Sequence, residues 1–223
     1  MRAFAVALLL AGAPGLAFAQ QIPPPPSPPP APPVFVERPV SGFVIDARGV
    51  LAKFGPRPAT AQALGVNTGD LPGPGRGGVV GAHIYPVRLG PMAIGVGAEI
   101  MLARRSKQPL QLSGEPLGDE LHARAFSMSP QISFNFGHRN GWSFVSGGIG
   151  TASFETWPGS TEMPDRRVRA INYGGGARWF TSPHLAFTAD LRFYAMSIGP
   201  ASAGLEERPR QRLMMLSVGV SVR

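Results

Sequence analysis

The stretch that most constrains the fold is Ile171–Gly199, which reads as two strands joined by a tight turn. After a turn at Ser182-Pro183-His184, every second residue from Leu185 to Ala195 is apolar, and polar or small residues fill the positions between them. A period of two predicts a β-strand with one apolar face and one polar face. The segment is also long enough to cross a bilayer, which takes roughly 9–11 residues in a tilted strand.

The rest of the chain repeats this alternation, and tight and long connections alternate between the segments. The candidate strands are approximately Gly42–Phe54, Gly78–Val87, Met92–Arg105, Ala123–Phe136, Trp142–Phe154, Arg169–Phe180, Leu185–Ser197 and Arg210–Val222. Transmembrane barrels combine an even number of strands with short periplasmic turns and longer outer loops. The sequence therefore predicts an all-β chain, an eight-stranded antiparallel up-and-down transmembrane β-barrel with short periplasmic turns and longer extracellular loops.

The N-terminal residues predict export. Met1-Arg2, an apolar run and Ala17-Phe18-Ala19 form a secretory signal peptide over residues 1–19. Residues 20–40 are a Pro-rich periplasmic linker, because consecutive prolines favour an extended, semi-rigid helix, and residues 41–223 form the barrel. No apolar run of about 18 residues follows the signal, which excludes a membrane-spanning helix. We therefore expect the bacterial outer membrane, with both termini periplasmic.

A soluble barrel of the lipocalin kind would alternate in the same way, with its apolar face inward. The polar faces distinguish the two architectures: here they carry mainly Gly, Ser, Asn and Gln, and the only lysines of the whole chain are Lys53 and Lys107. Small residues suit the narrow lumen of an eight-stranded membrane barrel. Aromatic residues near the strand ends are expected to form interfacial girdles, and they are Phe43, Phe54, Tyr85, Phe136, Trp142, Trp157 and Trp179.

A more specific pattern supports the membrane barrel. Gly174-Gly175-Gly176-Ala177-Arg178-Trp179-Phe180, followed by Leu185 to Tyr194, resembles the outer-membrane β-barrel domain family of OmpA-, OmpX- and OmpW-type small barrels. The resemblance extends over about residues 41–223. It implies a structural, adhesive or unassigned role without shared catalytic residues, and insertion by the barrel-assembly machinery. That machinery usually recognises a terminal aromatic residue, whereas this sequence ends in Val222-Arg223.

The alternation also places a set of ionisable side chains on the lumen face. They are Asp46, Arg48, His83, Glu99, Arg178, Asp190 and Arg192. Buried charges are tolerated when they are paired and hydrogen-bonded, and carboxylates and guanidiniums occur here in equal number. We expect a salt-bridged plug that fills the barrel. The alternative is that the same network gates a narrow channel or small-solute conduit of the OmpW kind.

Basic residues gather at the outer ends of the strands. They are Arg104, Arg105, Lys107, Arg124, Arg166, Arg167, Arg169, Arg208, Arg210 and Arg212. The formal net charge is +8, and an exported protein meets anionic lipid rather than nucleic acid. Arginine binds phosphate in a forked geometry, so this collar suits lipopolysaccharide; a solvated rim partly neutralised by nearby acids is the alternative. We expect a monomer whose partners are outer-membrane lipid and lipopolysaccharide, with no nucleic acid.

Some barrels of this size modify lipid A, and a deacylase would need a serine activated by a histidine on the outer wall. His122 lies at the outer end of a strand, and no serine stands at cross-strand spacing from it in the predicted register. The glycines of Gly174–Gly176 do not open a helix, so they are no nucleotide-binding loop. We expect no enzyme, no cofactor and no metal, but a structural or interaction role.

Overall fold

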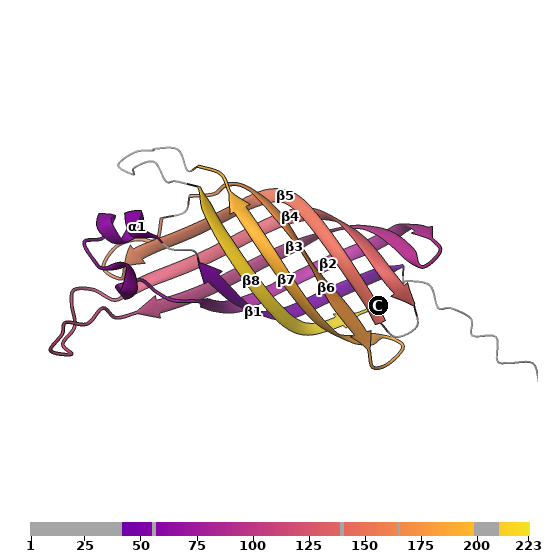
Figure 1. Ribbon diagram of the computed structural model, residues 1–223, viewed down its shortest axis with the longest axis horizontal. Helices are drawn as coiled ribbons and strands as arrows, with labels where there is room; N and C mark the ends of the chain where they lie inside the picture. The colour runs from indigo at the N-terminus through magenta and orange to yellow at the C-terminus, as the bar shows by residue number, and fades with distance from the viewer. Residues whose placement is uncertain (1–41, 55–56, 139–140, 165, 199–209) are drawn as a thin grey trace, which may run out of the picture. The chain divides into compact units, whose positions relative to one another are not determined.

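The computed structural model describes residues 42–54, 57–138, 141–164, 166–198 and 210–223 (Figure 1). The predicted signal peptide (1–19), the Pro-rich linker (20–40) and Arg208 lie outside these residues. Eight strands form one closed antiparallel barrel in chain order, and β1 pairs with β8 to complete it. The predicted eight-stranded up-and-down barrel is therefore confirmed.

Every predicted segment forms a strand. The strands are β1 (Phe43–Phe54), β2 (Gly75–Leu89), β3 (Met92–Lys107), β4 (Leu121–His138), β5 (Gly141–Pro158), β6 (Val168–Phe180), β7 (Leu185–Met196) and β8 (Gln211–Val222). Several are longer than predicted: β2 begins at Gly75 rather than Gly78, and β4 still pairs with β5 where Leu121 lies opposite Pro158. Backbone pairing thus continues past the point where the side-chain alternation is clear.

The two ends of the barrel differ in their connections. At the short-turn end these are residues 90–91, 139–140 and 181–184, and at the long-loop end they are residues 55–74, 108–120, 159–167 and 197–210. Gly90 completes the turn between β2 and β3 at a φ of 60°, a left-handed conformation that glycine adopts without steric cost. Because successive side chains of a strand point to opposite faces of the sheet, the parity of a residue along its strand decides whether it faces the lumen or the outside.

The outer wall carries a continuous band of exposed apolar side chains. The band includes Ile45, Leu51, Val80, Ile84, Ile100, Ile132, Phe134, Val145, Ile149, Ile171, Phe187, Val218 and Val220. Val80 is 57% exposed and Ile132 is 54% exposed, and contiguous apolar surface of this kind marks contact with lipid or another apolar partner. A lipocalin-like barrel would turn these side chains inward. In this barrel they point outward.

Side chains fill the lumen in layers. An apolar layer at the short-turn end consists of Val44, Tyr85, Ala93, Trp142, Phe180 and Ala186. A charged layer follows in the middle. A larger apolar layer fills the long-loop half and includes Val50, Val79, Met101, Phe154, Tyr194 and Met215. An eight-stranded barrel is just wide enough for its own side chains to occupy the interior, so this lumen is a packed core.

The interfacial position predicted for Phe54, Tyr85 and Trp142 is wrong. Tyr85 and Trp142 are buried inside the barrel, and Phe54 packs against the apolar layer of the long-loop half. Phe43 and Trp179 do face outward, at 48% and 50% exposure. The prediction considered only that these residues lie near strand ends. Whether such a side chain points into the lumen or outward depends on whether its position in the strand is odd or even.

The long connection between β1 and β2 contains two short helices, α1 (Pro58–Ala63) and η1 (Thr68–Asp70). Ala61 and Leu71 from this connection pack with Leu121 at the start of β4 in a small apolar cluster. The connection is thereby held against the long-loop end of the wall. In the described part of the chain, neither helix has the length and hydropathy needed to cross a membrane.

Candidate functional site

The charged layer of the lumen brings together all seven ionisable residues that the sequence places there. Each is at most 5% exposed, and together they come from β1, β2, β3, β6 and β7. We call this layer the charge belt, with members Asp46, Arg48, His83, Glu99, Arg178, Asp190 and Arg192. Removing charges from water is costly, so a buried set of this size requires partners for every member.

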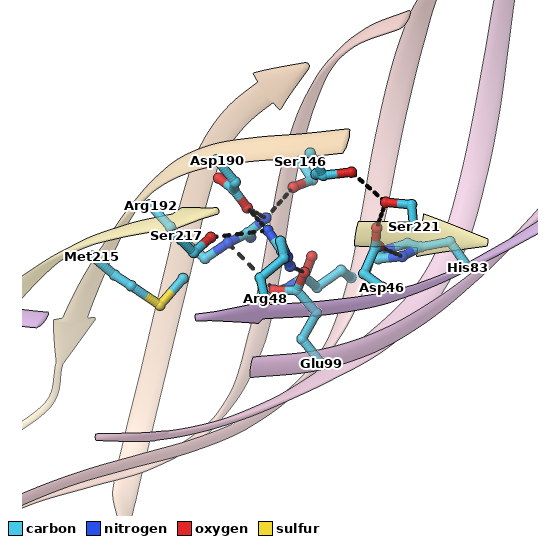
Figure 2. A network of polar contacts seen from close by, with 12 residues as sticks. Asp46, Arg48, His83, Glu99, Ser146, Asp190, Arg192, Met215, Ser217 and Ser221 are labelled. Atoms are coloured by element: carbon cyan, nitrogen blue, oxygen red, sulfur yellow. Dashed lines mark hydrogen bonds and ion pairs between the residues drawn. The ribbon is translucent and has the colours of Figure 1, made fainter. Parts of the chain in front are cut away.

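Four residues of the belt form a closed ring of alternating charge, the charge quartet (Figure 2). Arg48 donates to Glu99 and, through Nη1, to Oδ2 of Asp190 at 2.6 Å. Arg192 lies 3.0 Å from the same Asp190 oxygen through Nη2, and its Nε lies 3.4 Å from Oε2 of Glu99. Each cation therefore contacts both anions, and the quartet has no net formal charge.

Neutral polar side chains add further hydrogen bonds to the quartet. Arg192 donates to Oδ1 of Asn172 at 2.8 Å and to Oγ of Ser146 at 2.7 Å. Gln131 donates through Nε2 to Oε2 of Glu99 at 2.8 Å. Sequence reasoning missed these contacts because it selected ionisable residues only. The signal that could have found them is parity, since Gln131, Asn172 and Ser146 all occupy lumen positions on their strands.

The rest of the belt lies nearer the short-turn end and centres on a second ion pair. Arg178 donates to Asp46 in the forked geometry, through Nε at 3.2 Å and through Nη2 at 2.8 Å. Ser221 also donates to Asp46, and Nδ1 of His83 lies 3.8 Å from Oδ2 of the same carboxylate. Figure 2 shows Ser221 and His83 close to Asp46. The belt thus balances its carboxylates and guanidiniums locally.

Stacked aromatic rings close the lumen at the long-loop end. Phe54 of β1 and Phe154 of β5 lie parallel, with ring centroids 4.0 Å apart. The guanidinium of Arg57 lies over both rings, at 5.3 Å and 4.8 Å from their centroids, and donates to Oγ1 of Thr156 at 2.7 Å and to the Pro72 carbonyl at 2.8 Å. Partial burial lowers the pKa of Arg57 to about 10, so the side chain stays protonated at neutral pH and keeps its cation–π contacts.

The short-turn end is closed in a similar way. The guanidinium of Arg223 lies 3.8 Å from the ring centroid of Phe180 and 5.5 Å from that of Trp142. Its Nε also donates to the carbonyl of Pro183 at 2.7 Å. An arginine over an aromatic pair therefore covers each end of the packed lumen.

The structure places the described members of the basic collar around the long-loop end. Arg104 and Arg105 lie in β3, Lys107 ends it, Arg124 lies in β4, Arg169 in β6 and Arg212 in β8. The remaining described members, Arg166, Arg167 and Arg210, precede β6 or β8. Arg166 is 3.4 Å from Glu155, so acids do engage part of the collar. Arg76 of β2 belongs with these residues, and sequence reasoning missed it because the predicted strand began at Gly78.

The structure also shows a serine opposite His122, which the sequence reasoning did not find. Ser106 is the cross-strand partner of His122 because β3 and β4 extend beyond their predicted ends at Arg105 and Ala123. Their side chains make no hydrogen bond to each other in the described structure, and the His122 ring lies 5.7 Å from the Trp157 ring instead. Among the described residues, no group of three or more His, Cys, Asp or Glu could hold a metal ion.

Comparison with known proteins supports the fold. No protein-family model matches the chain, and no curated protein matches its sequence. Neisserial surface protein A (NspA) is similar with a TM-score of 0.51 at 14% identity, over 82% of this chain and 97% of that one. The outer membrane protein OprG from Pseudomonas aeruginosa gives a TM-score of 0.44 at 7% identity, over 81% of this chain and 94% of that one.

A further similar structure is Ail, the attachment invasion locus protein of Yersinia pestis, in complex with the heparin analogue sucrose octasulfate. Its TM-score is 0.42 at 12% identity, over 80% of this chain and 96% of that one. The likeness to NspA confirms the predicted resemblance to small outer-membrane barrels at the level of the fold.

Proposed function

We propose that this chain is a bacterial outer-membrane barrel protein with a structural or interaction role and a closed lumen. The observation that carries the proposal is the continuous apolar band on the outside of a closed barrel. In lipid every backbone polar group needs a partner within the protein, and a closed barrel leaves no unpaired strand edge. By the usual architecture of such barrels the long-loop end faces the exterior, and both termini are periplasmic.

The filled lumen favours a plug over a conducting path. The charge quartet spans the middle of the barrel, and an apolar layer lies on each side of it. An ion on a path through the barrel would have to cross both apolar layers and displace paired charges, which is costly in a low-dielectric interior. The narrow-channel alternative would need coordinated opening of both ends as well as the quartet.

The basic collar supports contact between the long-loop end and lipopolysaccharide. The exposed guanidiniums of Arg104, Arg169 and Arg212 lie at that end of the strands, beyond most of the apolar band. This is the level at which lipid phosphates meet an outer-membrane barrel, and Arg is well suited to bind them. The proposal is for a monomer that acts by contact and has no catalytic step.

The proposal is tested by expressing the full chain with its own N-terminus and fractionating the envelope. A folded barrel remains compact in detergent until boiled, so the outer-membrane fraction should contain a band whose gel mobility changes on heating. A periplasmic product with one mobility would overturn the proposal. Soluble behaviour would mean that another partner covers the apolar outer band.

A further inference from the structure

Three arginines lie side by side on the outer wall at the long-loop end. Arg76 of β2 is the cross-strand partner of Arg104 of β3, and Arg104 is in turn the partner of Arg124 of β4. Directly opposed side chains in an antiparallel pair have Cβ atoms roughly 4.5–5.5 Å apart. We call these residues the arginine row. Like charges at this spacing repel one another, so the row is unfavourable unless an anion lies among them.

The protein does not supply that anion to two members of the row. Arg76 and Arg104 have no ion pair or hydrogen bond from their side chains within the described structure, and both are exposed. Arg124 is half-buried against the sulfur of Met163, at 3.1 Å, and the ring of Phe126. The carboxylate that follows in the row, Glu155, pairs with Arg166 from the β5–β6 connection. The positive charge of Arg76 and Arg104 is therefore available to an external partner.

Arg76 and Arg104 help to line a largely apolar groove of about 820 Å³ on the outer wall. Its sides are Val80, Ile100 and Leu102, and small residues leave the middle open. Gly49 and Gly78 are opposite each other across β1 and β2. A Cβ added at either glycine would meet only a carbonyl oxygen at 3.7 Å, an ordinary contact. The backbone does not require glycine at these positions, and their effect is to keep the groove open.

We propose that Arg76, Arg104 and this groove form a binding site for a phosphorylated acyl lipid. The phosphate would lie between the two guanidiniums, and an acyl chain would lie along Gly49 and Gly78. Two forked donors match the oxygens of one phosphate, and its charge removes the repulsion within the row. An apolar trough that continues from the charged end fits a lipid better than a free anion. This site deepens the proposed function, on which its location in a membrane rests.

The test uses the full chain folded in a neutral detergent and native mass spectrometry of bound lipid. Dioleoyl phosphatidic acid supplies phosphate and chains, dioleoylglycerol supplies the chains alone, and inorganic phosphate supplies the anion alone. We expect the wild type to retain phosphatidic acid preferentially over both. The double variant Arg76→Gln/Arg104→Gln should bind it at least about tenfold more weakly, since charge-assisted hydrogen bonds are lost.

Two further variants separate the parts of the site. Gly78→Leu fills the groove and leaves both arginines, and it should also weaken phosphatidic acid binding. Arg88→Gln removes one exposed arginine from the short-turn end of β2, where it lies opposite Ala93 rather than another arginine, and it should bind like the wild type. Heat-modified gel mobility verifies that each variant is folded. Without lipid, Arg76→Gln/Arg104→Gln should be at least as stable as the wild type, because repulsion is relieved.

The inference would be overturned by equal binding in the wild type and the double arginine variant, or by a loss in Arg88→Gln as large as in the double variant. Loss in the double arginine variant with no effect of Gly78→Leu would also overturn it, because the site would then hold an anion and not an acyl lipid. These results are independent of the envelope fractionation. A failed site in a protein that fractionates with the outer membrane would leave the proposed function intact.

Discussion

Phe54 and Phe154 stack across the lumen with their planes inclined by only 12°, although they belong to strands on opposite sides of the barrel. Aromatic pairs of this kind contribute roughly 0.5–1.5 kcal/mol beyond the area that they bury. Here the contact joins β1 to β5, which share no backbone hydrogen bond. The stack therefore stabilises the barrel by a contact across the lumen, and Arg57 covers the two rings.

The first prediction concerns conduction. The wild-type protein in planar bilayers should give no resolved current steps. Phe54→Ala/Phe154→Ala should also remain closed, because the charge quartet and the second apolar layer still fill the lumen. Stepwise conductance of the wild type would contradict the plug and favour the narrow-channel alternative.

The charge quartet gives the second prediction. Glu99→Gln leaves the guanidiniums of Arg48 and Arg192 with Asp190 as their remaining acid partner in the ring. Breaking a buried pair by removing one partner costs about 3–5 kcal/mol, and urea unfolding in lipid vesicles should show a loss of that order. The matched variant Arg48→Met/Glu99→Met removes one charge of each sign and should cost less. If the double variant lost as much unfolding free energy as the two single variants together, Arg48 and Glu99 would not be energetically coupled.

The third prediction is the pH dependence of the cap at the long-loop end. Burial lowers the pKa of Arg57 from the usual range of an arginine to about 10. Below about pH 10 the group is protonated in both the folded and the unfolded protein, so its effect on stability is constant there. Above that pH the unfolded state binds more protons, so stability rises with pH through this group. The difference in unfolding free energy between wild type and Arg57→Gln should therefore be the same at about pH 6 and about pH 9.

Urea titrations of the two proteins side by side measure that difference. If it changes between these pH values, another titrating group depends on Arg57, and the cap would not act as described.

The fourth prediction compares two glycines in the wall. A Cβ at Gly97 would lie 2.2 Å from the carbonyl oxygen of Ala82 and 2.5 Å from the His83 ring, whereas one at Gly49 would have an ordinary contact at 3.7 Å. Gly97→Ala should unfold at clearly lower urea concentration or fail to give the heat-modifiable band. Gly49→Ala should behave as the wild type. If the two variants were equally stable, the backbone of β2 opposite Gly97 could shift to make room for the methyl group without loss of stability.

The fifth prediction concerns catalysis. Expression of the protein should leave lipid A unchanged by mass spectrometry, because Ser106 and His122 lie opposite each other without a hydrogen bond between their side chains in the described structure. A deacylated product that disappears in Ser106→Ala would overturn the non-enzymatic role.

The strands and their faces were predictable because alternation is a local signal. Parity alone placed Asp46, Arg48 and Glu99 in the lumen, where the structure buries them. Which acid meets which base was not predictable, since the quartet joins residues from β1, β3 and β7 that are close only after the barrel closes. The residues at which the strands begin and end were not predictable either.

Two misses followed from those ends. Arg76 and Ser106 lie in the extensions of β2 and β3, where hydrogen bonding to a neighbouring strand maintains the sheet without help from alternating side chains. Arg57 was missed for a different reason. It lies outside any strand, and its position over Phe54 depends on the path of the connection that carries it.

The stacked rings at the long-loop end have a consequence for how such a chain can diverge. Both rings belong to strands of the barrel, so this layer of the filled lumen does not depend on the sequence of the connections. Insertions and replacements in the β3–β4 or β5–β6 connections can then change the surface at the long-loop end without opening the barrel. In the proposed role, binding at the long-loop end and closure of the lumen are therefore separate traits, and selection can act on one while the other stays constant.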